Sequence, residues 1–116
     1  MEIKSDAKLV RIIIGESDKH HHIPVYEKIV IEARKFGLAG ATVFKGVMGF
    51  GSNSRIHTSK ILRLSEDLPV LIEIVDELDK IESFMPVLHA IFEEANCGGL
   101  ITLEKAEVIK YIASQS

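Results

Sequence analysis

The sequence predicts an α+β domain with the ferredoxin-like order strand, helix, strand, strand, helix, strand and an antiparallel sheet. Three observations support this fold class. Several segments are rich in β-branched and aliphatic residues, two segments repeat apolar residues at helical spacing, and glycine or proline separates most of them. The chain has 116 residues, long enough to bury a core and too short for two, so we predict one domain over residues 1–116.

Residues 8–15, KLVRIIIG, are predicted to form a central strand because they are almost entirely β-branched and aliphatic. Alternation assigns these residues to two faces: Val10, Ile12 and Ile14 to one, and Leu9, Arg11 and Ile13 to the other. A polar loop is expected over residues 16–22.

An amphipathic helix is predicted after this loop. Pro24 suits its first turn, and Gly37 stands where a C-terminal cap is expected. Between them, apolar residues recur at spacings of three and four: Tyr26, Ile29, Val30 and Ala33. Residues 40–49, GATVFKGVMG, then return to a composition typical of strands.

The second half of the chain predicts a strand, a helix and a strand. Residues 61–76 are expected to form a strand interrupted near residues 65–67, because Pro69 cannot donate to a ladder; residues 70–75 are its clearest part. Asp76 is a candidate cap for the helix over residues 77–95, which Pro86 must kink or divide. The helix is indicated by an apolar stripe: Ile81, Phe84, Met85, Leu88, Ile91, Phe92 and Ala95. Residues 100–112 supply the last strand, with a second short strand from Val108 as an alternative.

Two helices on one side of such a sheet leave its other face uncovered. A face that carries Leu9, Ile13, Val43 or Phe44 would be an exposed apolar patch in a monomer. We therefore predict that sheets pack together in an oligomer.

Composition narrows the function classes. The formal net charge is −3 and the basic residues are scattered, which argues against nucleic acid as a partner. No apolar run approaches the length of a membrane span, and the N-terminal residues do not resemble a signal peptide, so we expect a cytoplasmic protein without membrane insertion. The single cysteine, Cys97, fits a reducing compartment and is expected to be structural.

The glycine-rich stretch GVMGFGSNSRIHTS, residues 46–59, is the main candidate for a site. Its glycines allow close approach of the backbone, so successive N–H groups can converge on an anion, and Lys45, Arg55, His57 and Lys60 could supply charge to a phosphate. The spacing matches neither a Walker loop nor the dinucleotide fingerprint. Taken alone, the stretch is more typical of a hairpin tip with glycine-driven turns.

The segments VMGFG, residues 47–51, and DLPVLIEIVD, residues 67–76, resemble the pattern of PII signal-transduction proteins. There, a Val-x-Gly-Phe-Gly strand end opens the long T-loop and a Leu-Pro-x-x-x-Ile-Glu strand follows it. The chain is more similar still to a family of small PII-like proteins of uncharacterised function, through GLAGATVFKGVMGFG and LSEDLPVLIEIVD. This resemblance covers nearly the whole chain.

The resemblance implies a homotrimer that binds an adenine nucleotide, ATP, ADP or AMP, in the clefts between subunits. It also implies a T-loop, here about residues 50–60, that changes shape to engage a regulated protein whose identity the sequence does not give. The nucleotide-binding residues implied by position are Gly49, Phe50, Gly51, Ser52, Asn53, Arg55, Gly98 and Gly99.

This sequence departs from the PII pattern in two places. Residues 97–100, CGGL, lack the acid and the lysine of the Gly-Asp-Gly-Lys phosphate loop, so Arg55, His57, Lys60 or Lys105 would have to offset phosphate charge. No tyrosine lies between residues 51 and 67, so the uridylylation of some PII proteins has no acceptor.

Three consecutive histidines, His20, His21 and His22, offer a different kind of site. Adjacent imidazoles do not easily converge on one ion, and no Cys-x-x-Cys or His-x-x-x-His spacing accompanies them, so a solvated loop is favoured and no metal site is assigned. If a metal binds, His20 and His22 are the better pair, because alternate side chains of an extended segment share a side. A metal-responsive trimer similar to the CutA copper-tolerance proteins is therefore one alternative function, and a ligand-free assembly module is another.

No arrangement of residues in the sequence predicts catalysis. His89 stands beside the apolar stripe of the second helix without a nucleophile at a recognisable spacing, and the helix C-terminus near Cys97 does not favour a thiolate. We therefore predict a protein that is not an enzyme.

Overall fold

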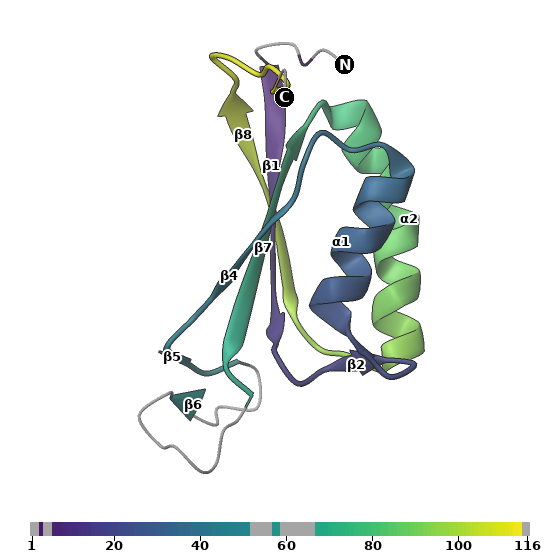
Figure 1. Ribbon diagram of the computed structural model, residues 1–116, viewed down its shortest axis with the longest axis vertical. Helices are drawn as coiled ribbons and strands as arrows, with labels where there is room; N and C mark the ends of the chain where they lie inside the picture. Colours follow the sequence, from purple (N-terminus) through teal and green to yellow (C-terminus); the bar gives the residue numbers. More distant parts are fainter. Residues whose placement is uncertain (1–2, 4–5, 52–56, 59–66, 115–116) are drawn as a thin grey trace.

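The computed structural model describes residues 3, 6–51, 57–58 and 67–114. A four-stranded antiparallel sheet, in the order β4-β7-β1-β8, packs one face against two helices (Figure 1). Its elements are β1 (Asp6–Gly15), α1 (Val25–Phe36), β4 (Thr42–Lys45), β7 (Pro69–Asp76), α2 (Leu78–Ala95) and β8 (Leu100–Glu107). Two short pairs accompany them, β2 (Lys19–His20) with β3 (Ile23–Pro24) and β5 (Met48–Gly49) with β6 (His57–Thr58). The predicted α+β ferredoxin-like order is confirmed.

Strand β1 lies inside the sheet because both of its edges are paired. Ile12 stands opposite Ile72 on β7 and Ile101 on β8. Val10, Ile12 and Ile14 are buried under the helices, whereas Ile13 is exposed on the opposite face. The alternation predicted for this strand is therefore correct.

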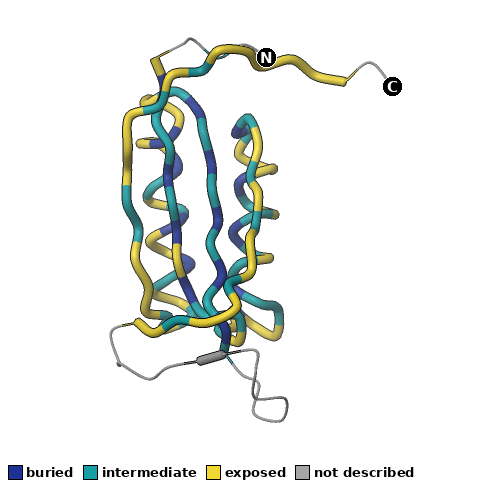
Figure 2. The backbone as a smooth tube through the Cα atoms, turned by 90° about the vertical axis from the view of Figure 1, so that its left-hand side faces the viewer, coloured by how far each residue is buried: buried dark blue, intermediate teal, exposed yellow. Residues whose placement is uncertain are grey.

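The core lies between the sheet and the two helices. Figure 2 marks its buried positions along the central strands and along both helices. Helix α1 contributes Val25, Ile29 and Ala33, and it ends where Gly37 adopts the left-handed conformation expected of a cap. Helix α2 contributes four buried side chains at helical spacing: Ile81, Phe84, Leu88 and Ile91. None of the helices that the structure describes is long and apolar enough to span a bilayer.

Helix α2 runs without interruption through Pro86, and its N-cap residue differs from the one predicted. Pro86 does not divide the helix, and it lies on the exposed side, where water can satisfy the carbonyl that its ring leaves without a donor. Glu77, not Asp76, is the N-cap residue. Asp76 is instead buried at the end of β7, where it accepts hydrogen bonds from the backbone N–H groups of Ala39 (2.9 Å) and Glu77 (2.7 Å).

Two further expectations were wrong. The second short strand from Val108 is absent, since residues 108–114 have no regular secondary structure. The polar loop over residues 16–22 is interrupted by the β2–β3 hairpin, in which Lys19 pairs with Pro24 and His20 pairs with Ile23. The pattern of polar residues could not reveal this hairpin, because His20 is buried within it.

The uncovered face of the sheet, which we call the open face, is divided by polarity. Its apolar end, near the start of β8, carries Ile13, Phe44, Leu71 and Leu100, which the strand register aligns. In its middle, Arg11 forms ion pairs with Glu73 (3.0 Å) and Glu104 (2.8 Å). The expected apolar patch is therefore present, and Phe44 rather than Val43 belongs to it. Val43 packs on the helix side, because it stands opposite the core residue Ile72.

Candidate functional site

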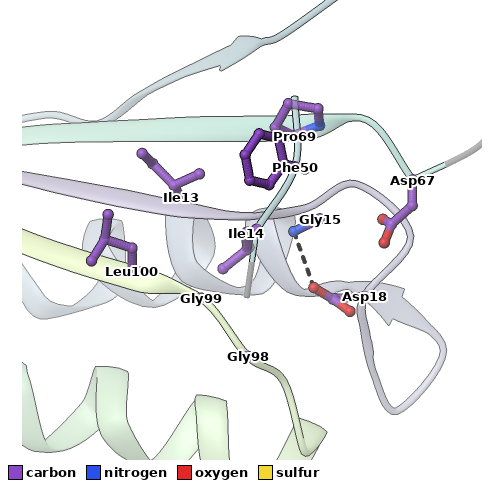
Figure 3. Close-up of a pocket in the computed structure, with 11 residues that line it drawn as sticks. Ile13, Ile14, Gly15, Asp18, Phe50, Asp67, Pro69, Gly98, Gly99 and Leu100 are labelled. Atoms are coloured by element: carbon purple, nitrogen blue, oxygen red, sulfur yellow. Dashed lines mark hydrogen bonds between the residues drawn. The ribbon is translucent and has the colours of Figure 1, made fainter. Parts of the chain in front are cut away.

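A pocket of about 510 Å³ lies at the end of the sheet where β1 ends and β8 begins (Figure 3). This volume is within the range of small-molecule sites. Four segments of chain line it: Ile13, Ile14, Gly15 and Asp18; Phe50 and Gly51; Asp67 and Pro69; and Gly98, Gly99 and Leu100. The antiparallel pairing of Ile13 with Leu100 brings the first and last of these segments together.

The structure brings together four of the residues that the sequence singled out. Phe50 and Gly51 line one side of the pocket, and Gly98 and Gly99 line another. Gly49 does not line the pocket. A Cβ atom at Gly49 would lie 3.1 Å from Cγ of Pro69, which does line the pocket, so Gly49 packs against a residue of the pocket wall. Ser52, Asn53 and Arg55 lie outside the described residues.

Gly99 is required by the close approach of β8 to β1. A Cβ atom at this position would lie 2.7 Å from the carbonyl oxygen of Ile13, 2.8 Å from Ile14 Cγ2 and 3.0 Å from Phe92 Cε2. Since a backbone oxygen on an interior strand cannot move aside cheaply, glycine is the residue that fits. Gly98 differs, because nothing lies within 4 Å of its added Cβ.

Two carboxylates that the sequence did not single out as site residues lie beside the end of β1: Asp18 in the turn after β1, and Asp67 just before β7. Asp18 Oδ2 accepts a hydrogen bond from the Gly15 N–H (3.1 Å), and Asp67 Oδ1 accepts one from the Ser17 N–H (2.9 Å). The Asp67 carboxylate rests against Gly15 and leaves no room there for a Cβ atom. The Asp18 bond closes the turn after β1, and the Asp67 bond holds the chain just before β7 against that turn.

The lining residues give the pocket a definite chemical character. Its walls include the apolar side chains of Ile13, Phe50, Pro69 and Leu100, and its charged side chains are the two carboxylates. Among the described lining residues there is no lysine or arginine. This arrangement suits a flat apolar group that carries hydrogen-bond donors. The described lining residues offer no positive charge to a phosphate, so that charge would have to come from other residues.

Lys105 does not supply that charge within its own chain. It stands five residues beyond Leu100 along β8, about 17 Å at the usual rise per residue, and pairs with Lys8 at the far end of the sheet. Lys45 forms an ion pair with Glu16 at 2.7 Å. Lys60 lies outside the described residues, and of His57 only the backbone is described.

Cys97 lies beside the pocket and is held as a thiol. Its Sγ–H donates to Asp18 Oδ2 at 3.3 Å. Burial raises the pKa of Cys97 to about 12, and the hydrogen bond and negative charge of Asp18 act in the same direction. The expected structural role of this residue agrees with that environment.

We expect native Cys97 to react slowly with Ellman's reagent at about pH 8, since the thiolate is the nucleophile and the raised pKa keeps the group protonated. The same protein in denaturant should react faster, because unfolding restores an ordinary thiol pKa. Asp18→Asn should accelerate the native reaction, whereas Glu93→Gln, on the exposed side of α2, should not. Equal rates for Asp18→Asn and wild type would contradict this account.

The three histidines adopt an arrangement that the sequence analysis did not foresee. His20 is buried and its Nε2 lies 2.6 Å from Glu94 Oε1, whereas His21 and His22 are exposed and have positive φ angles of 49° and 82°. The pairing expected for His20 and His22 assumed an extended backbone, which these angles exclude. Instead, His20 and His21 lie together with Glu94. His89 is exposed on α2.

Comparisons with solved structures identify the fold. The chain is similar to CPII, a nitrogen regulatory PII-like protein from Thiomonas intermedia K12, in its complex with ADP, AMP and bicarbonate; the TM-score is 0.68, with 16% identity and 90% of each chain covered. It is also similar to a putative PII-like signaling protein from Thermus thermophilus, with a TM-score of 0.58, 16% identity and 94% of each chain covered. The fold is therefore PII-like, as the sequence resemblance implied.

Comparisons of sequence identify the family. A UPF0166 protein from Aquifex aeolicus (strain VF5) is 38% identical over 102 residues, which cover 88% of this chain and 92% of the relative. A UPF0166 protein from Methanocaldococcus jannaschii is 35% identical over 104 residues, with 90% and 93% covered. The family model DUF190, described as "Uncharacterized ACR, COG1993", matches residues 7–108. The chain belongs to the DUF190 (UPF0166) family of proteins with a PII-like fold.

Proposed function

We propose that this protein is a PII-like regulatory protein, a single domain that binds an adenine nucleotide and carries out no catalysis. The observation that carries the proposal is the pocket itself, where Phe50 and Gly51 meet Gly98 and Gly99. These are the segments to which the PII resemblance assigned nucleotide contacts. The complex of CPII with ADP and AMP supports an adenine nucleotide as the effector.

The chemistry of the pocket suggests how the nucleotide would lie. The adenine ring would occupy the apolar part, near Phe50 and Pro69, and the carboxylates of Asp18 and Asp67 would accept hydrogen bonds from amino or hydroxyl groups. Phosphates would be repelled by these carboxylates and would point away from them. Arg55 and Lys60 are the basic side chains that we propose for the phosphates.

Assembly into a homotrimer is part of the proposal. Ile13 and Leu100 belong both to the apolar end of the open face and to the pocket wall. A neighbouring copy that covers this end would therefore also close the pocket, which supports a ligand site between subunits. Such a site would allow basic residues of a second copy to approach the phosphates.

Regulation would follow from a shift in population. If nucleotide phosphates contact the segment from Phe50 to residue 60 in one of its conformations, binding enriches that conformation, and a regulated protein that prefers it is then engaged. A nucleotide with equal affinity for all conformations would change nothing. The proposal therefore requires a difference in affinity between them.

The proposal predicts that ADP, ATP or AMP raises the melting temperature of the purified protein, because a ligand of the folded state stabilises it. Light scattering on the same sample should give the mass of a trimer. In titration calorimetry, Phe50→Ala should weaken the nucleotide by about tenfold, since an aromatic contact to a base contributes on the order of 1–2 kcal/mol.

Phe36→Ala is the matched control for this experiment. Phe36 on α1 is also exposed, although less so (40% against 67% for Phe50); it packs against Phe84 and does not line the pocket. Its substitution should leave nucleotide affinity unchanged even if it lowers the melting temperature. Absence of binding by all three nucleotides would contradict the proposed function and favour an assembly module.

A further inference from the structure

A cluster of metal-ligating side chains lies outside the pocket, where the β2–β3 hairpin packs against the C-terminal part of α2. His20 and His21 come from the hairpin, and Glu94 comes from the last turn of the helix. One ligand atom from each residue can be chosen so that all three lie within 4.8 Å of one another. Two imidazoles and a carboxylate form a donor set typical of zinc and related transition metals.

The local backbone brings the two imidazoles together. His20 pairs with Ile23, and the chain turns through His21 and His22, both with positive φ. This conformation is unusual for a residue other than glycine or asparagine. As a result the rings of His20 and His21 lie edge to face, with centroids 4.4 Å apart, and are not directed to opposite sides as in an extended strand.

His20 supplies a fixed ligand position. Its side chain is 7% exposed, and its Nε2 lies 2.6 Å from Glu94 Oε1. Burial of the ring limits its rotation, whereas the Glu94 side chain is 58% exposed and can adjust.

We propose that His20, His21 and Glu94 bind a divalent transition metal ion, with Zn²⁺ the best match and water completing the coordination. Metal–ligand distances of about 2.0–2.2 Å in a tetrahedral site place ligand atoms about 3.3 Å apart. The contact between His20 and Glu94 must therefore lengthen by a little under 1 Å, and His21 must move inward. Both changes require movement only of the exposed side chains of His21 and Glu94, while the buried side chain of His20 stays in place.

The position of this site gives it a structural consequence. The hairpin that carries His20 and His21 follows Asp18, and α2 leads directly into Gly98 and Gly99. A metal would therefore link the two segments of chain that enter adjacent walls of the pocket. Metal binding can be tested without any assumption about the pocket's ligand, so its failure is distinguishable from failure of the proposed function.

The test is titration calorimetry of chelator-treated protein with Zn²⁺, together with the visible absorption of Co²⁺ as a spectroscopic substitute. Wild type should bind one ion per chain, and Co²⁺ should give the intense bands of a tetrahedral complex. His21→Asn and Glu94→Gln should each weaken Zn²⁺ by roughly tenfold or more, because each removes one of three protein ligands.

His22→Asn is the matched control, since His22 is the next residue, is equally exposed, has positive φ and is outside the cluster. Asparagine tolerates positive φ, so both histidine variants should keep the hairpin and the melting temperature of the metal-free protein. Unchanged binding in His22→Asn supports the site. Equal weakening by His21→Asn and His22→Asn, or no Zn²⁺ binding by wild type, would overturn it.

Discussion

Replacement of Asp76 by alanine is expected to lower the free energy of unfolding by about 2–6 kcal/mol. The Asp76 side chain is buried and accepts hydrogen bonds from the N–H groups of Ala39 and Glu77. Alanine would leave both donors without this acceptor, and each loss costs about 1–3 kcal/mol. The two bonds join the loop after α1 to the start of α2, so both helices should lose anchorage. Urea denaturation measures the effect.

Two variants test this explanation for Asp76. Asp76→Asn keeps one acceptor oxygen and should lie between wild type and Asp76→Ala. Asp79→Ala removes an exposed carboxylate from the first turn of α2 and should cost less than about 1 kcal/mol, the usual effect of charge near a helix end. A loss in Asp76→Ala no larger than that in Asp79→Ala would mean that the buried hydrogen bonds contribute little.

Gly99→Ala is expected to destabilise the protein by about 1–3 kcal/mol and to weaken any ligand of the pocket. The new methyl group would lie 2.7 Å from the Ile13 carbonyl oxygen, so β8 must shift away from β1 or the core must rearrange around Phe92. Because Gly99 and Ile13 both line the pocket, the shift would also displace its wall. Thermal unfolding and nucleotide titration of the same variant report the two effects.

Gly98→Ala is the control at the neighbouring residue, and it is expected to raise the free energy of unfolding rather than lower it. Nothing lies within 4 Å of a Cβ atom there, and Gly98 is not among the described glycines with positive φ. Alanine at such a position restricts the unfolded chain and stabilises the fold by up to about 1 kcal/mol. If both variants lost stability equally, close packing at Gly99 would not be the cause.

Periodicity predicted the fold well, because the sheet has only one covered face. In β1 the buried set Val10, Ile12 and Ile14 alternates with residues of the open face, and in α2 the buried residues follow the helical stripe. Gly37 was predictable as a cap because few other residues adopt its φ of 88°. The sequence left open whether Val43 or Phe44 faces away from the helices, because a short strand of four residues gives alternation little opportunity to define its register.

The pocket was only half predictable. The resemblance to PII proteins indicated Phe50, Gly51, Gly98 and Gly99, all of which line it. Asp18 and Asp67 were missed because whole elements, among them α1 and β4, lie between them in the chain, and they become neighbours only when β7 pairs with β1. The signal that could have revealed these two residues is the antiparallel pairing of β1 with β7, which brings them together. The meeting of His20 and His21 with Glu94 depends on the left-handed turn of the hairpin, for which the sequence shows no glycine.

The pairing of β1 with β7 and β8 has a consequence for how the protein is made. β1 is the first strand of the sheet to leave the ribosome. Ile12 can pair on one side only after Ile72 has been synthesised, and on the other side only after Ile101 has been synthesised. Contacts of such high sequence separation slow folding, since the entropy of closing long loops is lost before the contacts form. Until β8 is synthesised, the aliphatic segment LVRIII retains an unpaired edge. Nascent chains of this protein are therefore expected to be at greatest risk of aggregation before the last strand emerges.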